Sequence, residues 1–181
     1  MGDYGRVEAD SEMKLTIRPL TPDDWKWLDR EKEKPDRRGV ESKGAYAYVA
    51  LDAKGKPVGV TLGLADMGGG DTAILGYVRA FDGLWTTMLA LLWRQAQNGI
   101  DTGHKFAIAS VPMDNRRQCT NVAATADLTA GLSQRVGLQW EPEGTKRGIV
   151  AYQKTQPVPL AAFVALCAAY LKSQGVEVEF I

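Results

Sequence analysis

The chain has 181 residues, of which 45% are hydrophobic and 24% are charged, as in one ordinary globular domain. Its 22 basic and 22 acidic side chains cancel, so no net field attracts nucleic acid or anionic lipid. The single histidine excludes a multi-histidine metal site, and the sequence carries no clustered carboxylate motif and no Walker phosphate-binding motif. Metal chemistry and nucleoside triphosphate chemistry are therefore not expected.

Targeting signals are not expected either. Residues 1–12 are polar and without period, and the longest uncharged apolar stretch, 157–171, is shorter than the roughly 20 residues that span a bilayer. We therefore expect a cytoplasmic protein without a membrane or nucleic-acid partner. Cys119 and Cys167 lie in alanine-rich stretches without a CxxC spacing, which favours free buried thiols over a disulfide.

The first predicted elements are a strand and a helix. Residues 14–20 alternate as a half-buried strand does, and Thr21-Pro22-Asp23-Asp24 carries the signals of a helix start. We expect this helix over about 22–34. Trp25 and Leu28 share its apolar stripe and are expected in the core, whereas Trp27 lies off the stripe and is available to line a cleft.

The remaining elements alternate between strands and helices. Apolar runs and turn signals predict strands at 45–51, 58–64, 73–80, 106–111 and 147–153. Helical spacing predicts helices at 84–98, ended by Gly99 in a left-handed conformation, and at 122–136. This order predicts an α/β (α+β) fold with a mixed, mostly antiparallel sheet of about six to seven strands and helices on both faces.

The order and spacing resemble the GNAT superfamily of acyl-CoA-dependent N-acetyltransferases. Residues 15–24, Leu-Thr-Ile-Arg-Pro-Leu-Thr-Pro-Asp-Asp, look like the opening strand and first helix of that family. Gly-Lys-Pro-Val-Gly-Val at 55–60 looks like its third strand, and Arg-Val-Gly-Leu-Gln-Trp at 135–140 looks like the end of its fourth helix. The resemblance implies a GNAT-like domain at 13–155, between a flexible tail and a C-terminal helix and strand at 156–181.

The resemblance also implies acetyl-CoA as the cofactor. In that family one strand pairs with the pantetheine arm, and the next helix holds the pyrophosphate at its N-terminus. Residues 75–79 then face the cofactor, and Gly76 marks either an ordinary bulge or a close approach to the ligand. The implied cofactor-binding residues are Tyr77, Val78, Arg79, Asp82, Gly83, Leu84, Trp85 and Asn115.

The phosphate loop departs from the pattern of the family. In the motif that begins at Arg79, Asp82 replaces the first glycine and Leu84 replaces the last small residue, so the one glycine present is Gly83, one place out of register. As a helix cap, Asp82 would occupy donors that a phosphate needs and would repel the phosphate. A cap and a cofactor loop both remain open as interpretations.

The catalytic residues implied by the resemblance are also altered. Ser133 stands where the family has a tyrosine as general acid, and a serine hydroxyl is a poor acid. Tyr77 and Tyr152 lie on neighbouring predicted strands and are the available phenols, although tyrosines on strands are also ordinary packing residues. Candidates for a base are Asp66, Glu41 and His104, the last of which also fits a solvated position at a strand edge.

The C-terminal segment and the function each leave two interpretations. The helix expected at 159–172 has no polar face, and 176–181 alternates as an edge strand does; the segment either roofs the sheet or contacts a second chain. One function is transfer of acetyl from acetyl-CoA to an amine of a small molecule or protein. The other is a catalytically inactive subunit of a larger assembly, such as a bacteriophage virion component.

Overall fold

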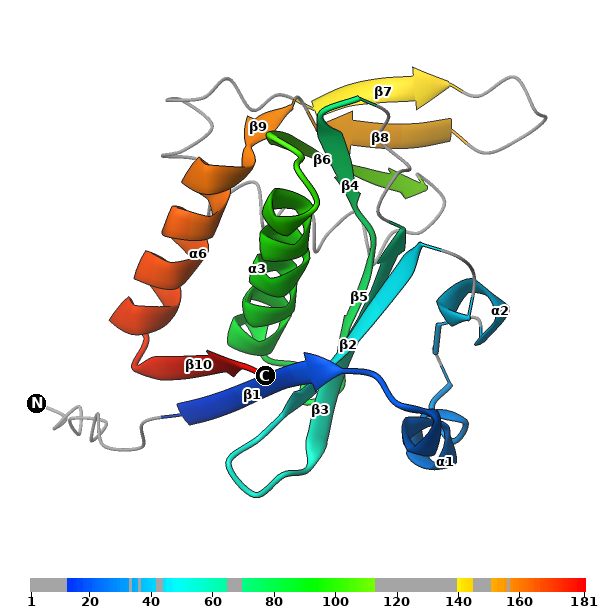
Figure 1. Cartoon of the computed structure of the whole chain (residues 1–181), viewed down its shortest axis with the longest axis vertical. Coiled ribbons are helices and arrows are strands. Elements are labelled where there is room, and N and C mark those ends of the chain that lie inside the picture. The colour runs from blue at the N-terminus through cyan, green and yellow to red at the C-terminus, as the bar shows by residue number, and fades with distance from the viewer. Residues whose placement is uncertain are drawn as a thin grey trace, which may run out of the picture.

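The computed structural model describes residues 13–32, 34–35, 37–41, 44–64, 70–112, 140–144, 151–155 and 157–181. Within these residues the chain forms strands and helices in an alternating order (Figure 1). The strands are β1 (Met13–Pro19), β2 (Ala45–Leu51), β3 (Pro57–Leu64), β4 (Thr72–Leu75), β5 (Tyr77–Ala80), β6 (Phe106–Pro112), β7 (Trp140–Gly144), β8 (Ala151–Thr155), β9 (Val158–Pro159) and β10 (Val176–Phe180). The helices are the 3₁₀ turn η1 (Pro22–Asp24), α1 (Trp25–Leu28), α2 (Arg37–Val40), α3 (Trp85–Asp101) and α6 (Leu160–Ser173).

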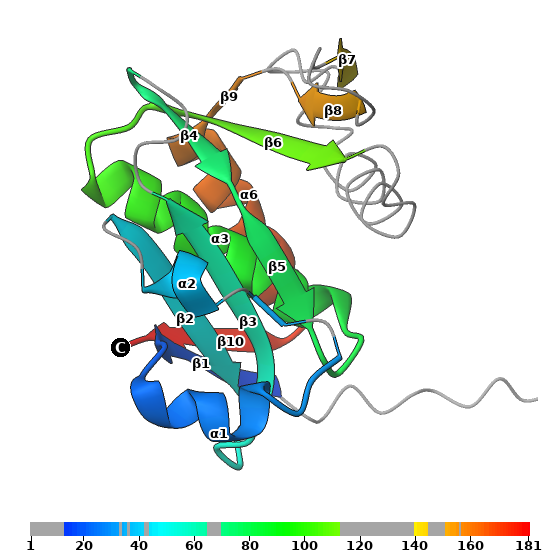
Figure 2. The same cartoon turned by 90° about the vertical axis from the view of Figure 1, so that its right-hand side faces the viewer.

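The strands form two sheets. The first has the order β10-β1-β2-β3-β5, and the second has the order β4-β6-β8-β7 with β9 also paired to β6. The β1–β10 and β4–β6 pairs are parallel and the other pairs are antiparallel. Helices α3 and α6 lie on one side of the first sheet, and α1 and α2 lie on the other (Figures 1 and 2). The predicted mixed sheet with helices on both faces is confirmed.

The chain passes from one sheet to the other at Gly76. Residues 72–75 pair with β6 in the second sheet, whereas 77–80 pair with β3 in the first. A Cβ atom on Gly76 would collide with the carbonyl oxygen of Leu62, so only glycine lets the chain pass this close to β3. The single strand expected at 73–80 is therefore wrong, because the close approach of two backbones interrupts it.

Two hydrophobic clusters hold the helices on the first sheet. On the side of α1, Trp25 and Leu28 are buried against Val49 and Val60, which confirms the two predicted core residues of the first helix. The cluster on the side of α3 and α6 is larger and contains residues from both ends of the described chain. Its fully buried members include Leu15, Ile17, Ala50, Ala90, Leu91, Ala96 and Leu160.

The first helix is shorter than expected. The capping arrangement of Thr21 and Asp24 is present, but α1 ends at Leu28 rather than near Lys34. Beyond Leu28 the chain turns, and the Lys34 ammonium binds both the carbonyl oxygen and the carboxylate of Asp29. The residues after Leu28 are charged and offer no apolar stripe to bury against the sheet, so packing does not extend the helix.

Helix α3 is longer than expected. It runs through Gly99 to Asp101, and the left-handed residue that follows it is Gly103, with φ of +87°. Gly99 is buried, and a Cβ there would lie 3.1 Å from a methyl group of Leu160. This glycine therefore permits close packing of α6 on α3 rather than ending the helix.

The C-terminal segment packs against the same core. Helix α6 buries Leu160, Phe163, Cys167 and Leu171, and β10 extends the first sheet at β1. Burial raises the pKa of the Cys167 thiol to about 12, which agrees with the expected free buried cysteine; Cys119 lies outside the described residues. No helix in the described part of the chain is long and apolar enough to cross a membrane.

Candidate functional site

The parallel pair of β4 and β6 ends where the two sheets separate. Its last paired residues are Leu75 and Ala109, after which β5 follows β3 while β6 pairs with β8. Figure 2 shows that β6 runs in a different direction from β4 and β5. Because β5 is the last strand of its sheet, no strand of the described residues pairs with its second edge.

Main-chain groups of β5 are directed toward that second edge. The Phe81 N–H donates to the Val58 carbonyl at 2.7 Å, one position beyond the paired residues Gly59 and Ala80. Residues of an antiparallel strand alternate between facing the partner strand and facing away from it. The N–H groups of Val78 and Ala80 therefore turn away from β3, toward the side on which β6 has separated.

The loop between β5 and α3 is open at Gly83. This residue is exposed, has φ of +70°, and has no atom within 4 Å of the place where a Cβ would stand. Helix α3 begins at Trp85, and the Met88 N–H donates to the Leu84 carbonyl at 3.3 Å as the first bond of the helical ladder. The amides of residues 85–87 thus precede the ladder at the positive end of the helix.

The carboxylate of Asp82 lies at this same helix start. One of its oxygens accepts a hydrogen bond from the Leu84 N–H at 2.9 Å, and the other accepts one from the Thr87 hydroxyl at 2.6 Å. These contacts are those of a capping side chain, although the N-cap residue itself is Leu84. Asp82 therefore occupies one loop amide and places a negative charge beside the others.

A buried glutamine of α3 holds the break at Gly76. The Oε1 atom of Gln95 accepts hydrogen bonds from the Gly76 N–H at 2.7 Å and from the Tyr46 hydroxyl at 3.4 Å. Its Nε2 atom donates to the Thr61 hydroxyl oxygen and to the Tyr77 carbonyl, the latter at 3.4 Å. The Thr61 hydroxyl donates to the same Tyr77 carbonyl at 2.7 Å. Both ends of the Gln95 side chain are therefore satisfied.

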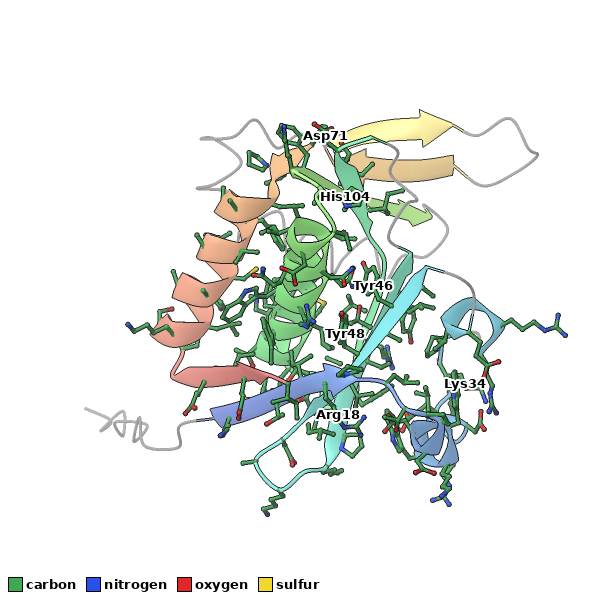
Figure 3. All side chains as sticks on the ribbon, in the orientation of Figure 1. Arg18, Lys34, Tyr46, Tyr48, Asp71 and His104 are labelled. Carbon is green, nitrogen blue, oxygen red and sulfur yellow. The ribbon has the colours of Figure 1, made fainter. Side chains whose placement is uncertain are left out.

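Sequence reasoning missed Gln95 and Tyr46. A signal for Gln95 was present, since it lies four residues after Leu91 and beside Ala96 on the apolar stripe of the helix. Figure 3 shows Tyr46 and Tyr48 between α3 and the sheet. Burial and the neighbouring Tyr48 raise the pKa of Tyr46 far above its ordinary value, so this phenol stays protonated.

The two proposed phenols belong to strands that do not pair with each other. Tyr77 lies half-buried in the α1-side cluster, and its strand pairs with β3. Tyr152 belongs to β8, which pairs with β6 and β7, so the expectation that the two tyrosines lie on neighbouring strands is wrong. The side chain of Tyr152 is not among the described ones. Ser133, Asn115 and Asp66 also lie outside the described residues.

One candidate base, His104, lies away from the loop at Gly83. His104 is buried, with 9% of its surface exposed, and its Nδ1 atom is 2.9 Å from the Thr102 hydroxyl, so the expected solvated position is wrong. It lies with Asp71 at the end where β4 and β6 begin (Figure 3). The 17 residues of α3 separate this end from Gly83 by about 25 Å. Glu41 is exposed and its carboxylate lies 3.0 Å from Arg37.

An ion pair fixes the aromatic contact beside the loop. The Arg18 guanidinium binds both carboxylate oxygens of Asp24, at 2.7 and 2.8 Å. Asp24 also accepts hydrogen bonds from the Thr21 N–H and the Trp27 indole, at 2.7 and 3.0 Å. Burial alone would raise the pKa of Asp24, but these bonds hold it well below its ordinary value. Trp27 in turn packs edge-on against Phe81, with ring centroids 5.8 Å apart.

Solved structures with a similar fold are spermidine N-acetyltransferases. One is the enzyme SpeG from Vibrio cholerae in complex with CoA and spermine, with 11% identity, a TM-score of 0.56, and 83% of this chain and 98% of that chain covered. Another is SpeG from the same organism in complex with manganese ions, with 12% identity, a TM-score of 0.53, and 83% and 95% covered. No protein-family model matches the sequence, and comparison with curated proteins also gave no match.

These similarities define the fold class. The chain has a GNAT-like acyl-CoA acyltransferase fold, as the sequence resemblance predicted. At 11 to 12% identity the likeness establishes the fold alone. The activity has to be argued from the site.

Proposed function

We propose that the chain is an acyl-CoA-dependent N-acyltransferase that binds acetyl-CoA between β5 and β6. One observation carries this proposal: the β4–β6 ladder stops at Leu75 and Ala109, and the edge of β5 left without a strand leads directly to the open loop at Gly83. An extended ligand can pair with such an edge as an added strand does. A phosphate can then bind at the helix start that follows.

The residues present fit the two halves of acetyl-CoA. The N–H groups of Val78 and Ala80 face the side from which a pantetheine amide would bind. The pyrophosphate would accept hydrogen bonds from the amides of residues 85 and 86, beside the space that the missing side chain of Gly83 leaves open. Among the contact residues that the resemblance implies, Tyr77 and Arg79 belong to β5, and Leu84 belongs to the loop between β5 and α3. Asn115 stays an expectation from the resemblance.

The transfer would be direct attack by an amine. The amine nitrogen forms a bond to the carbonyl carbon, the carbon–sulfur bond breaks, the nitrogen loses a proton and the thiolate gains one. Because a thiol has a pKa of about 8.5, the departing thiolate needs only a weak acid or water. Tyr152 and Ser133 remain the candidates for that acid, whereas Tyr77 is committed to packing on the α1 side. Spermidine and spermine are the first acceptors to test, since the similar structures are spermidine N-acetyltransferases.

A specific observation favours a second function, that of an inactive interaction subunit. The Asp82 carboxylate is bonded to the Leu84 amide and the Thr87 hydroxyl, in the place where a phosphate would bind. The outer side of α6 also exposes Ala161, Ala165 and Ala169, a surface without charge. These features would suit a chain that no longer binds acetyl-CoA and instead contacts another protein.

Calorimetric titration with acetyl-CoA separates the two functions. Wild-type protein should bind acetyl-CoA, and Asp82→Asn should bind it more tightly because the variant removes a charge that repels the pyrophosphate. A carboxylate about 6 Å from a group of charge about −2 costs about 1.4 kcal/mol in water before screening, so the gain should be about threefold to tenfold. Asp52→Asn is the matched control, since Asp52 also accepts main-chain hydrogen bonds in an exposed turn, between β2 and β3.

Each result has a defined meaning. Absence of measurable binding at millimolar acetyl-CoA, in both wild type and Asp82→Asn, would refute the acyltransferase proposal and leave the interaction subunit. Equal tightening by Asp82→Asn and Asp52→Asn would show that the effect is one of net charge and that the loop is wrongly placed. Transfer of radiolabelled acetyl to spermine, lost when acetyl-CoA is omitted, would then establish the reaction itself.

A further inference from the structure

The hydrogen bonds at Gly76 differ from those of an unbroken strand. If the β4–β6 ladder continued past Leu75 and Ala109, the main chain at Gly76 would pair with β6. Instead the Gly76 N–H donates to the Gln95 Oε1 atom at 2.7 Å. A side chain of α3 therefore takes the place of β6 as the partner of this N–H, while Thr61 and Gln95 add hydrogen bonds to the Tyr77 carbonyl on the side of β3.

We infer that Gln95 is a positioning residue that keeps β5 and β6 apart, so that the edge of β5 stays accessible to the acyl-CoA ligand of the proposed function. The side chain is 1% exposed, and its acceptor and its donor are both used at the break. A glutamine amide carries one oxygen acceptor and an NH₂ donor, which matches an N–H and a carbonyl presented side by side. No apolar side chain of similar size can satisfy both.

Loss of the amide would change which arrangement is favoured. An apolar residue at position 95 would leave the Gly76 N–H without its partner in a dry interior, which is costly. The neighbouring main chain of β6 offers replacement hydrogen bonds if the parallel ladder extends toward Tyr77. The parallel ladder with β6 would then continue along β5 without a break. This pairing would cover the edge of β5 that carries the N–H groups of Val78 and Ala80.

Amide hydrogen exchange, measured residue by residue by NMR without ligand, tests this inference. In Gln95→Met the Val78 and Ala80 amides should exchange at least tenfold more slowly than in wild type. Gln97→Met is the matched control: Gln97 is on the same helix, its amide bonds Asp101 in an exposed contact, and its replacement should leave these rates unchanged. A residue that merely stabilises the fold would give faster exchange on removal, so unchanged or faster exchange at Val78 and Ala80 in a folded Gln95→Met would overturn the inference.

Gln95→Glu keeps the test decisive where Gln95→Met does not fold. A protonated carboxyl group retains one acceptor and one donor, so at pH 5 this variant should show the exchange pattern of wild type measured at the same pH. At pH 8 the ionised group still accepts from the Gly76 N–H, so Val78 and Ala80 should keep the exchange rates of wild type at that pH as well. Slower exchange at Val78 and Ala80 in a folded Gln95→Glu would show that the hydrogen bond to Gly76 does not keep β5 and β6 apart.

Titration with acetyl-CoA distinguishes failure of this inference from failure of the proposed function. Gln95→Met should bind acetyl-CoA at least tenfold more weakly than wild type. If the exchange rates change as expected but wild type does not bind acetyl-CoA, Gln95 does open the strand and the acyltransferase proposal is wrong. If wild type and Gln95→Met bind equally and the exchange rates do not differ, the inference about Gln95 alone is wrong.

Discussion

Replacement of Asp24 by asparagine should destabilise the protein strongly. The Asp24 side chain is 5% exposed and its partner Arg18 is 25% exposed, so the substitution leaves a largely buried guanidinium without its counter-charge. Breaking a buried ion pair from one side costs about 3 to 5 kcal/mol. Water reaches Arg18 in part, so we expect the low end of this range, about 3 kcal/mol. The Trp27 indole would also lose charge assistance in its hydrogen bond to Asp24.

Urea unfolding followed by tryptophan fluorescence measures this loss, and the chain supplies a matched control. The neighbouring Asp23 pairs with Lys26 at 3.0 Å, but the two side chains are 86% and 80% exposed. Asp23→Asn should therefore change the free energy of unfolding by no more than about 0.5 kcal/mol. Equal effects of Asp23→Asn and Asp24→Asn would show that the Arg18 pair contributes nothing beyond an ordinary surface contact, and the argument from burial would be refuted.

Three further predictions concern acid, the strand break and the C-terminal helix. Because the folded pKa of Asp24 lies below its usual value of 3.8, its stabilisation is complete only above about pH 5 and is lost progressively as the pH falls through 3.8 toward the folded pKa; the urea midpoint of wild type should drop between pH 5 and pH 3, and Asp24→Asn should flatten that drop. Gly76→Ala places a Cβ against the Leu62 carbonyl and should lower the free energy of unfolding by at least about 2 kcal/mol; an unchanged urea midpoint would mean that β3 and the break are farther apart than described. Phe163→Ala removes a buried α6 ring from the core and should cost about 3 to 5 kcal/mol, whereas a loss below about 1 kcal/mol would indicate that α6 does not belong to this core.

Most of the fold could be predicted from local signals. Alternation of apolar residues predicted β1, because one face of this strand is buried against helices. Leu15 and Ile17 lie on that buried face. The capping arrangement of Thr21 and Asp24 was visible as spacing alone. The length of the first helix could not be predicted, because tertiary packing rather than propensity decides where a helix ends, and the side chains beyond Leu28 are charged.

The elements around the candidate site could be predicted, but the contacts between them could not. The strand, turn and amphipathic helix around Gly83 follow one another in sequence, and the structure has β5 and α3 in that order. The break at Gly76 depends on a contact with Leu62 of another strand and has no local signature. The place of Gln95 on the apolar stripe of α3 indicates its burial, but its hydrogen-bond partners are far from it in sequence and could not be predicted. Burial of His104 was missed for the same reason, since the chain just after it is hydrogen-bonded to the distant residues Asp71 and Leu160.

NMR titration of isotope-labelled protein with acetyl-CoA tests most directly whether ligand binds along β5. The account predicts that the amide signals of Val78, Ala80, Gly83 and residues 85–86 shift most and titrate together, while those of the β2–β3 turn at 52–56 do not move. Amide shifts that are absent at millimolar acetyl-CoA, or that are confined to α6 and β10, would contradict it.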